Sequence, residues 1–139
     1  MAIHPSALSQ ATLDDAGRAI IYTDGACKGQ GHHERLRRAG CGVFWGHGSP
    51  QNLGFPMGGP CQTNQRAELQ ATLAAVEQLG TDMRGHIKTD SAYVVGGVAC
   101  LSRWAHGGWS VGHADLWNRL AELPLRRPAG DIVVTKVLG

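Results

Sequence analysis

The spacing of the apolar residues changes along this chain in a definite order, and that order restricts the folds that the chain can adopt. Short β-branched runs separated by glycine-rich turns come first. The run that starts at Arg18 is expected to form a buried strand that stops in a turn at Asp24 and Gly25. Residues 41–46 and 52–59 are expected to be two more extended segments, so this part of the chain predicts an antiparallel meander.

The segment from Thr63 to Leu79 has the spacing of a helix instead. Its apolar residues recur about one turn apart, at Leu69, Leu73, Val76 and Leu79. We expect Thr63 as the N-cap and Gly80 as the C-cap. A strand at residues 86–90, further helices and a last strand follow, and a helix at residues 113–123 is expected to stop at Pro124. This order of elements predicts a mixed α/β domain.

The size and composition of the chain indicate one domain. It has 139 residues, of which 42% are hydrophobic. Residues 1–17 show no sustained pattern, so we expect a flexible lead-in there and the folded domain over residues 18–139. The net charge of +2 and the pI near 8.5 are only mildly basic, so bulk charge does not by itself indicate a nucleic-acid partner.

Cysteine usage and hydropathy restrict the cellular setting. The four cysteines form no Cys-x-x-Cys pair, which argues against a zinc framework and against a disulfide scaffold. Reduced thiols predict an intracellular protein, in the cytoplasm, the nucleus or an organelle. No apolar run approaches the roughly 18 residues of a membrane helix, and the first residues lack a signal-peptide pattern. We expect no membrane segment, and a monomer.

Two apolar runs end in the same short signature. These are Thr23-Asp24-Gly25 and Thr89-Asp90-Ser91. If the two strands are neighbours, their carboxylates converge at one edge of the sheet, and a helix crossing that edge could bring Glu68 to them. Three crowded carboxylates repel one another unless a cation compensates, and hard oxygen ligands favour Mg²⁺ or Mn²⁺. Two such ions, about 3.5 to 4 Å apart, can activate a water and stabilise the leaving oxygen of a phosphodiester.

The spacing alone leaves another interpretation open for each of these carboxylates. An aspartate after a strand is commonly part of an Asx-turn or the N-cap of the next helix. A glutamate in the second turn of a helix is usually a solvated partner of the helix dipole. Each residue taken singly therefore has a structural alternative.

Three segments resemble the active-site motifs of type 1 ribonucleases H in their order and separation. They are IYTDGAC, TNQRAEL and TDSAYV, and RAGCGVFWG is similar to the eukaryotic branch. The resemblance runs from Arg18 to the last residue, and it implies an α/β fold with a mixed five-stranded sheet and flanking helices. It also implies that Asp24, Glu68 and Asp90 are catalytic metal ligands for two Mg²⁺ or Mn²⁺ ions. The implied reaction is hydrolysis of the RNA strand of an RNA–DNA hybrid, which leaves a 5′-phosphate and a 3′-hydroxyl.

The resemblance also implies substrate-binding residues. Asn64 and Gln65 correspond to the turn that the family places in the minor groove. An amide has donors and acceptors and can engage a 2′-hydroxyl, the group that distinguishes RNA from DNA at a given site. Thr63 and Tyr93 match family positions that hold the DNA strand, and Gly25 of the first motif is carried over as a further contact.

The chain also departs from the family pattern. The family continues beyond the last strand to a helix that supplies a fourth carboxylate, so the resemblance implies that this chain lacks the family's last helix. Asp131 precedes the closing strand and Asp115 is expected to cap a helix, so neither replaces that group. Cys61 stands where the family's phosphate pocket has a basic residue. Two alternatives therefore stay open: a catalytically impaired hybrid-binding or scaffolding domain, and a fragment of a longer enzyme or retroelement polyprotein.

Other residues that could carry chemistry have simpler interpretations. His32, His33 and His47 lack a ligand spacing and are expected in exposed loops. The tryptophans are expected to pack in the core rather than to stack on bases; they are Trp104, Trp109 and Trp117. The basic cluster at residues 28–38 could be a solvated face or a phosphate-contacting edge.

Overall fold

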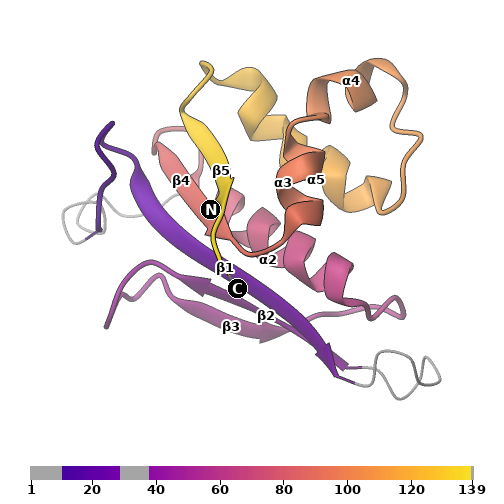
Figure 1. The fold of residues 1–139 in the computed structure, drawn as a ribbon, viewed down its shortest axis with the longest axis horizontal. Coiled ribbons are helices and arrows are strands. Elements are labelled where there is room, and N and C mark those ends of the chain that lie inside the picture. Colours follow the sequence, from indigo (N-terminus) through magenta and orange to yellow (C-terminus); the bar gives the residue numbers. More distant parts are fainter. Residues whose placement is uncertain (1–10, 29–37, 139) are drawn as a thin grey trace.

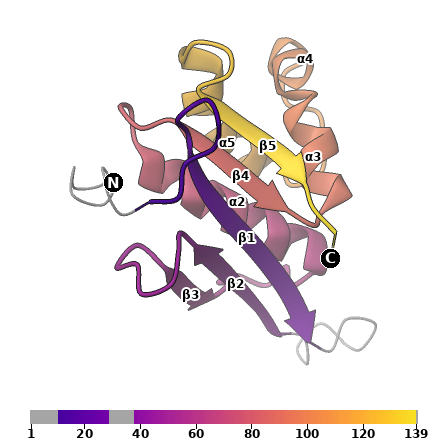
Figure 2. The same ribbon diagram turned by 60° about the vertical axis from the view of Figure 1, so that its left-hand side comes forward.

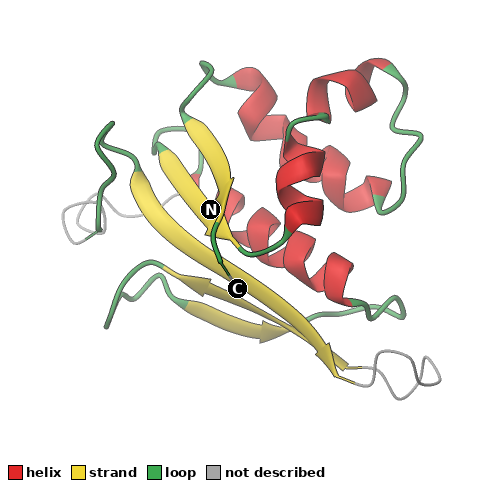
Figure 3. Ribbon diagram, viewed as in Figure 1, coloured by secondary structure: helices red, strands yellow, loops and turns green. Residues whose placement is uncertain are grey.

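A computed structural model of the chain describes residues 11–28 and 38–138, which form a mixed sheet with helices on one face (Figures 1 and 3). The elements follow in the order β1 Ala19–Lys28, β2 Arg38–Phe44, β3 Leu53–Pro56, α2 Asn64–Leu79, β4 Gly85–Thr89, α3 Ala92–Val98, α4 Leu101–His106, α5 Ala114–Arg126 and β5 Ile132–Lys136. The predicted α/β class and five-stranded sheet are thereby confirmed.

The strand order β3-β2-β1-β4-β5 places β1 at the centre of the sheet. Strands β1, β2 and β3 pair antiparallel, as the predicted meander requires. Strands β1, β4 and β5 pair parallel, and α2 makes the crossover from the meander to β4. The centre of the sheet is therefore the seam between its antiparallel and its parallel half.

Helix α2 begins and ends at the residues that the sequence indicates. The Thr63 hydroxyl accepts a hydrogen bond from the backbone N–H of Arg66, and Gly80 caps the other end in a positive-φ conformation. The apolar stripe of α2 faces the sheet, so Leu69 and Leu73 are fully buried against Ile21 and Ile87. This packing fixes α2 across β1 and β4.

Helices α3, α4 and α5 enclose a second part of the core around Trp117. That indole is fully buried, and a Cβ on Gly97 would lie only 2.1 Å from its Cη2 atom, so α3 and α5 approach closely there. Trp104 packs edge-on against Trp117 with a centroid distance of 5.2 Å. Trp109 is partly buried against the same core, so the expectation of packed rather than stacking tryptophans is confirmed.

Several predicted boundaries are wrong, because β2 begins before residue 41 and β3 ends before residue 59, and two further differences have a clear physical reason. Strand β1 does not stop at Asp24 and Gly25 but continues to Lys28, because β2 pairs with it residue by residue up to that point. Helix α5 does not stop at Pro124 but ends at Arg126. A proline removes one backbone donor, and this close to the helix end that loss is small enough for the last turn to form.

The N-terminal part of the described chain is held against the sheet. Asp14 accepts hydrogen bonds from Arg18, and its carboxylate lies 2.9 Å from the imidazole of His86 in β4. Residues 1–10 lie outside the described residues, so the expected flexible lead-in stays a prediction for them. None of the described helices is long and apolar enough to cross a membrane.

A candidate metal and nucleic-acid site

Asp24 and Asp90 lie side by side where the parallel pairing of β1 and β4 ends. The last paired residues are Tyr22 and Lys88, and each aspartate lies two positions further along its strand direction. Strand β4 ends at Thr89, whereas β1 continues past Asp24 with β2 as its neighbour. The predicted convergence of the two carboxylates therefore occurs, although only one of the two strands ends there.

Gly25 allows α2 to bring Glu68 to this edge. A Cβ on Gly25 would lie 2.3 Å from the carbonyl carbon of Ala67 and 2.4 Å from the backbone nitrogen of Glu68. Only a residue without a side chain permits such a contact between a strand and a helix backbone. The Gly25 N–H also donates a hydrogen bond to the Glu68 carboxylate. Gly25 therefore contacts the backbone of α2 on one side, and it pairs with Cys41 of β2 within the sheet.

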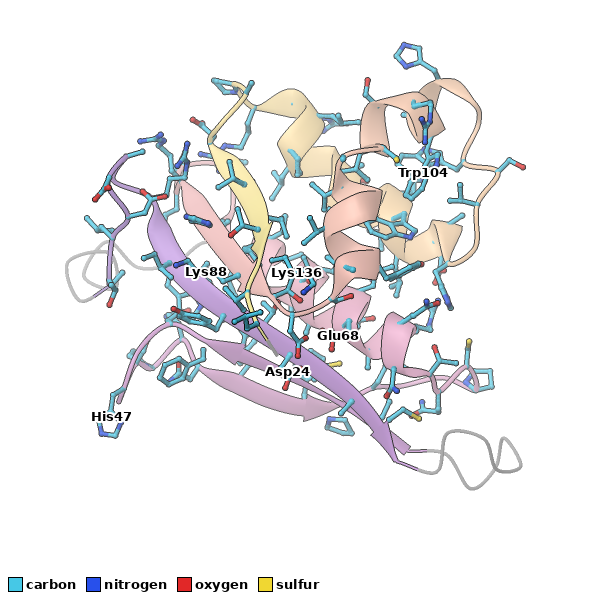
Figure 4. The ribbon with its side chains drawn as sticks, viewed as in Figure 1. Asp24, His47, Glu68, Lys88, Trp104 and Lys136 are labelled. Atoms are coloured by element: carbon cyan, nitrogen blue, oxygen red, sulfur yellow. The ribbon has the colours of Figure 1, made fainter. Side chains whose placement is uncertain are left out.

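Asp24, Glu68 and Asp90 form a compact group of carboxylates. One oxygen of each lies within 4.8 Å of one oxygen of the others. The aspartates are exposed and Glu68 is half-buried, and Figure 4 shows Asp24 of β1 close to Glu68 of α2. Burial, followed by the negative charges of Asp90 and Asp24, raises the pKa of Glu68 to about 8. A bound cation would relieve this repulsion, so the chemistry of the group fits a hard divalent metal.

Cys41 lies beside this group but is unsuited to binding a metal. Its side chain is buried, and its thiol donates to the carbonyl of Ala67 at 3.4 Å. Burial, with the nearby charge of Glu68, raises the pKa of the Cys41 thiol to about 11. Because only the thiolate is a good metal ligand, the set stays one of oxygen ligands.

Asn64 and Gln65, which are predicted to contact the minor groove, lie at the start of α2; we call these two residues the reading turn. Asn64 and Gln65 are exposed in its first turn, directly after the capping residue Thr63. The side-chain oxygen of Asn64 accepts a hydrogen bond of 2.7 Å from the backbone N–H of Cys27 in β1. This bond ties the reading turn to the strand that carries Asp24.

Tyr93 lies in the first turn of α3, close to Asp90 in the sequence. Ser91 caps that helix by accepting from the N–H of Val94. The Tyr93 hydroxyl accepts a hydrogen bond of 3.0 Å from the indole N–H of Trp117. The ring is partly buried, so its orientation is set by the core rather than by solvent.

An ion pair that the sequence did not indicate joins α2 to the start of α5. Both terminal nitrogens of Arg66 donate to the carboxylate of Asp115, at 3.1 and 2.6 Å. The N-cap of α5 is His113, so the expectation that Asp115 caps this helix is wrong. The two partners are 49 residues apart, and no local pattern in the sequence points to such a contact.

Figure 2 shows that the described helices leave one face of the sheet uncovered. A groove beside Asp24 is lined by residues of β1, β2 and β3. Its floor includes four glycines, which are Gly25, Gly40, Gly42 and Gly54. Asp24 pairs with Gly42 of β2, and Gly42 pairs with Gly54 of β3. The side chain of Asp24 is therefore the only one in this row across the three strands. Such a floor leaves room for the backbone of another chain next to the carboxylates.

The other residues that the sequence singled out lie away from the carboxylates or outside the description. His47 is exposed in the turn after β2, as expected (Figure 4). His32 and His33 lie outside the described residues, and so does most of the basic cluster at residues 28–38.

Comparison with known proteins gives consistent matches. A family model described as RNase H matches residues 16–138. Ribonuclease H1 of Homo sapiens is 41% identical over 95 residues, which cover 66% of this chain and 32% of that protein. Ribonuclease H of Schizosaccharomyces pombe is 34% identical over 113 residues, which cover 76% of this chain and 41% of that protein. This chain therefore spans less than half the length of these two relatives.

A bacterial relative and two solved structures extend the comparison. Ribonuclease H of Alcanivorax borkumensis is 37% identical over 108 residues, which cover 73% of this chain and 68% of that protein. The PFV RNase H domain has a TM-score of 0.68 at 24% identity, and the aligned part covers 86% of this chain and 78% of that domain. LC11-RNase H1, solved in complex with an RNA/DNA hybrid, has a TM-score of 0.56 at 24% identity, and the aligned part covers 86% of this chain and 84% of that one. The two structures show the shared fold.

The family match spans the whole described sheet and all three motifs that carry the carboxylates. Because the model of the family covers residues 16–138 and named relatives are 34% to 41% identical, the chain belongs to the type 1 ribonuclease H family.

Proposed function

We propose that this protein hydrolyses the RNA strand of RNA–DNA hybrids. The observation that carries the proposal is the convergence of Asp24, Glu68 and Asp90 within 4.8 Å of one another beside an exposed amide turn. The names of the relatives support it, because the human, yeast and bacterial proteins are each called ribonuclease H. The structure of LC11-RNase H1 in complex with an RNA/DNA hybrid supports the substrate class.

Asp24, Glu68 and Asp90 would hold two divalent cations, Mg²⁺ or Mn²⁺, in the substrate complex. When bound, such ions supply an activated water and stabilise the leaving oxygen of the phosphodiester. The raised pKa of Glu68 supports this role, because burial and the charges of Asp90 and Asp24 disfavour its ionised form, and a bound cation would favour that form again. The Gly25 N–H orients Glu68 by donating to its carboxylate.

Asn64 and Gln65 would read the minor groove, and Thr63 and Tyr93 would hold the DNA strand. The amides can exchange hydrogen bonds with a 2′-hydroxyl, which a DNA duplex lacks. The Tyr93 hydroxyl already accepts from Trp117, so its own proton is directed to another acceptor, such as a phosphate oxygen. The expected products carry a 5′-phosphate and a 3′-hydroxyl.

We also propose that residues 18–139 form the functional domain and that it acts as a monomer inside the cell. The four cysteines form no Cys-x-x-Cys pair, and this spacing agrees with a reducing compartment.

The direct test is the substitution Asp24→Asn, which removes one ligand charge and keeps the side-chain size. Cleavage of an end-labelled hybrid in Mg²⁺ and in Mn²⁺ should fall by more than about tenfold, or roughly 1.4 kcal/mol in the barrier. The exposed Asp82→Asn variant serves as the control, because it removes the same charge before the first residue of β4, whereas Asp90 follows the last residue of that strand. A hybrid that the wild-type protein binds but does not cleave would favour a binding or scaffolding role instead.

The reading turn is tested by replacing Asn64 and Gln65 with alanine. The preference for hybrid over DNA duplex should shrink, whereas the salt dependence of binding should stay nearly the same, because amides read the sugar and basic residues neutralise phosphates. Competition binding at two salt concentrations measures both quantities. An unchanged hybrid preference would exclude this role for the turn.

A further inference from the structure

Arg66 lies in the first turn of α2, directly after Asn64 and Gln65. Its backbone N–H donates to the capping hydroxyl of Thr63 at 3.2 Å. Its side chain is only 19% exposed and makes the two-point contact with Asp115. Two parallel hydrogen bonds between a guanidinium and a carboxylate fix direction as well as distance. The same residue is therefore bonded to the reading turn by its backbone and to α5 by its side chain.

The side chain of Arg66 also supports the turn that starts α5. Its Nη1 atom lies 3.1 Å from Nδ1 of His113. Because a guanidinium only donates, Nδ1 accepts this hydrogen bond and the ring proton lies on Nε2. His113 has a left-handed backbone, with φ 55° and ψ 32°, and its carbonyl accepts from the N–H groups of Leu116 and Trp117. A left-handed residue with a side chain persists only when its surroundings hold it.

The contact continues from His113 to Tyr93. The two rings meet edge-on, with a centroid distance of 6.3 Å and an interplanar angle of 85°. Trp117, one turn further along α5, donates to the Tyr93 hydroxyl. The start of α5 therefore touches Tyr93 on one side and Arg66 on the other.

We infer that Arg66 is a positioning residue that sets the spacing between the reading turn of α2 and Tyr93, through its contacts with Asp115 and His113. The inference rests on the proposed function, in which Asn64 and Gln65 contact one part of a hybrid and Tyr93 another. Arg66 points to α5 rather than to the carboxylates, so it governs how tightly the hybrid is held and leaves the chemical step alone.

A second ion pair between the same two helices provides a matched control. Arg119 of α5 donates to Glu77 of α2 at 3.0 Å, with 57% and 46% of the side chains exposed. This pair lies near the end of α2 that is remote from Asn64. If Arg66 only fastened α2 to α5, loosening either pair would have the same effect on the substrate.

The experiment compares matching variants of the two ion pairs. Arg66→Lys is compared with Arg119→Lys, and Asp115→Asn is compared with Glu77→Gln. Dissociation constants for a labelled hybrid are measured in EDTA, and KM and kcat are measured separately in Mg²⁺ or Mn²⁺. Melting curves confirm that each variant is folded. Lysine keeps the charge but loses the two-point contact, and asparagine keeps the size but loses the charge.

We expect Arg66→Lys and Asp115→Asn each to weaken hybrid binding and to raise KM by about five- to tenfold, with kcat within about twofold of wild type. The two control variants should stay within about twofold in every quantity, as exposed ion pairs usually do. Unchanged binding in the Arg66 and Asp115 variants would overturn the inference. Equal losses in both pairs, or a fall in kcat alone, would overturn it as well.

The same measurements separate this inference from the proposed reaction. If the wild-type protein binds hybrid without cleaving it, the proposed hydrolysis fails, and the dissociation constants still decide the role of Arg66. If the wild-type protein binds no hybrid, both are wrong.

Discussion

Gly25 shows how a single residue can determine the distance between a strand and a helix. The backbone of α2 lies so close to β1 that even one methyl group would overlap Ala67 and Glu68. The position of the Glu68 carboxylate relative to Asp24 therefore depends on the absence of a side chain at residue 25.

We predict that Gly25→Ala destabilises the protein and weakens metal binding together. The helix backbone has to move away from β1, which costs about 1–3 kcal/mol or more and carries Glu68 with it. Thermal unfolding and metal titration measure the two effects. Gly96→Ala in α3 is the matched control, since a Cβ there meets nothing within 4 Å and alanine favours a helix. A Gly25→Ala protein that melts with the wild type would contradict this explanation.

The residues of the candidate site differ in how far the sequence can predict them. Asp24 and Asp90 end similar apolar runs, and strand direction then brings them together. The pair of Arg66 and Asp115 could not be predicted, because its members are far apart in the chain and their meeting depends on how α5 packs on α2. His113 gave no signal either, since its left-handed backbone follows from that packing.

For helices and strands, the sequence predicts the interior of an element better than the residue at which it ends. The caps of α2 could be assigned because Thr63 and Gly80 act through local hydrogen bonds. The end of β1 could not, because a partner strand distant in sequence decides how far its pairing continues. Helix α5 likewise passes Pro124, because the loss of one backbone donor so close to the helix end still allows a last turn.

The contact of the N-terminal segment with β4 should depend on pH. Burial by itself would raise the pKa of Asp14, but hydrogen bonds from Arg18, His86 and Ala16 outweigh it and hold that pKa well below its usual range. The ionised carboxylate therefore stabilises the fold above the ordinary aspartate pKa of 3.8, and this contribution is lost as the pH falls below that value.

Asp14→Asn should accordingly lower the free energy of unfolding at neutral pH, and this loss should shrink progressively as the pH falls from 3.8 towards the low pKa of the folded state. Urea unfolding of both proteins near neutrality and at about pH 2 gives the comparison. The neighbouring exposed Asp15→Asn variant should show no such difference between the two conditions. A loss of equal size at both pH values would mean that the Asp14 charge does not contribute.

For the whole molecule, the carboxylates link stability to metal concentration. A cation that binds only the folded state raises the melting temperature in proportion to the logarithm of its concentration over its dissociation constant. Mn²⁺ should have a larger effect than Mg²⁺, because the described cluster has three carboxylates and Mg²⁺ demands a nearly ideal octahedral set.

We predict that Asp24→Asn weakens this dependence of stability on metal concentration. Without metal it should melt as high as the wild type or higher, because one of three mutually repelling groups is gone. With metal it should gain much less. Melting curves with EDTA, Mg²⁺ and Mn²⁺ test both parts, and Asp82→Asn should behave like the wild type. Equal metal responses of Asp24→Asn and wild type would exclude Asp24 as a ligand.

The central place of β1 also has a consequence for folding. Its pairing with β2 closes a short loop, whereas its pairing with β4 must close a loop that contains the rest of the meander and all of α2. Contacts between distant parts of a chain form slowly, and the two aspartates meet only through the second pairing. On the ribosome, the hairpin of β1 and β2 can therefore form early, but the nascent chain gains its carboxylate cluster only after β4 has emerged and docked.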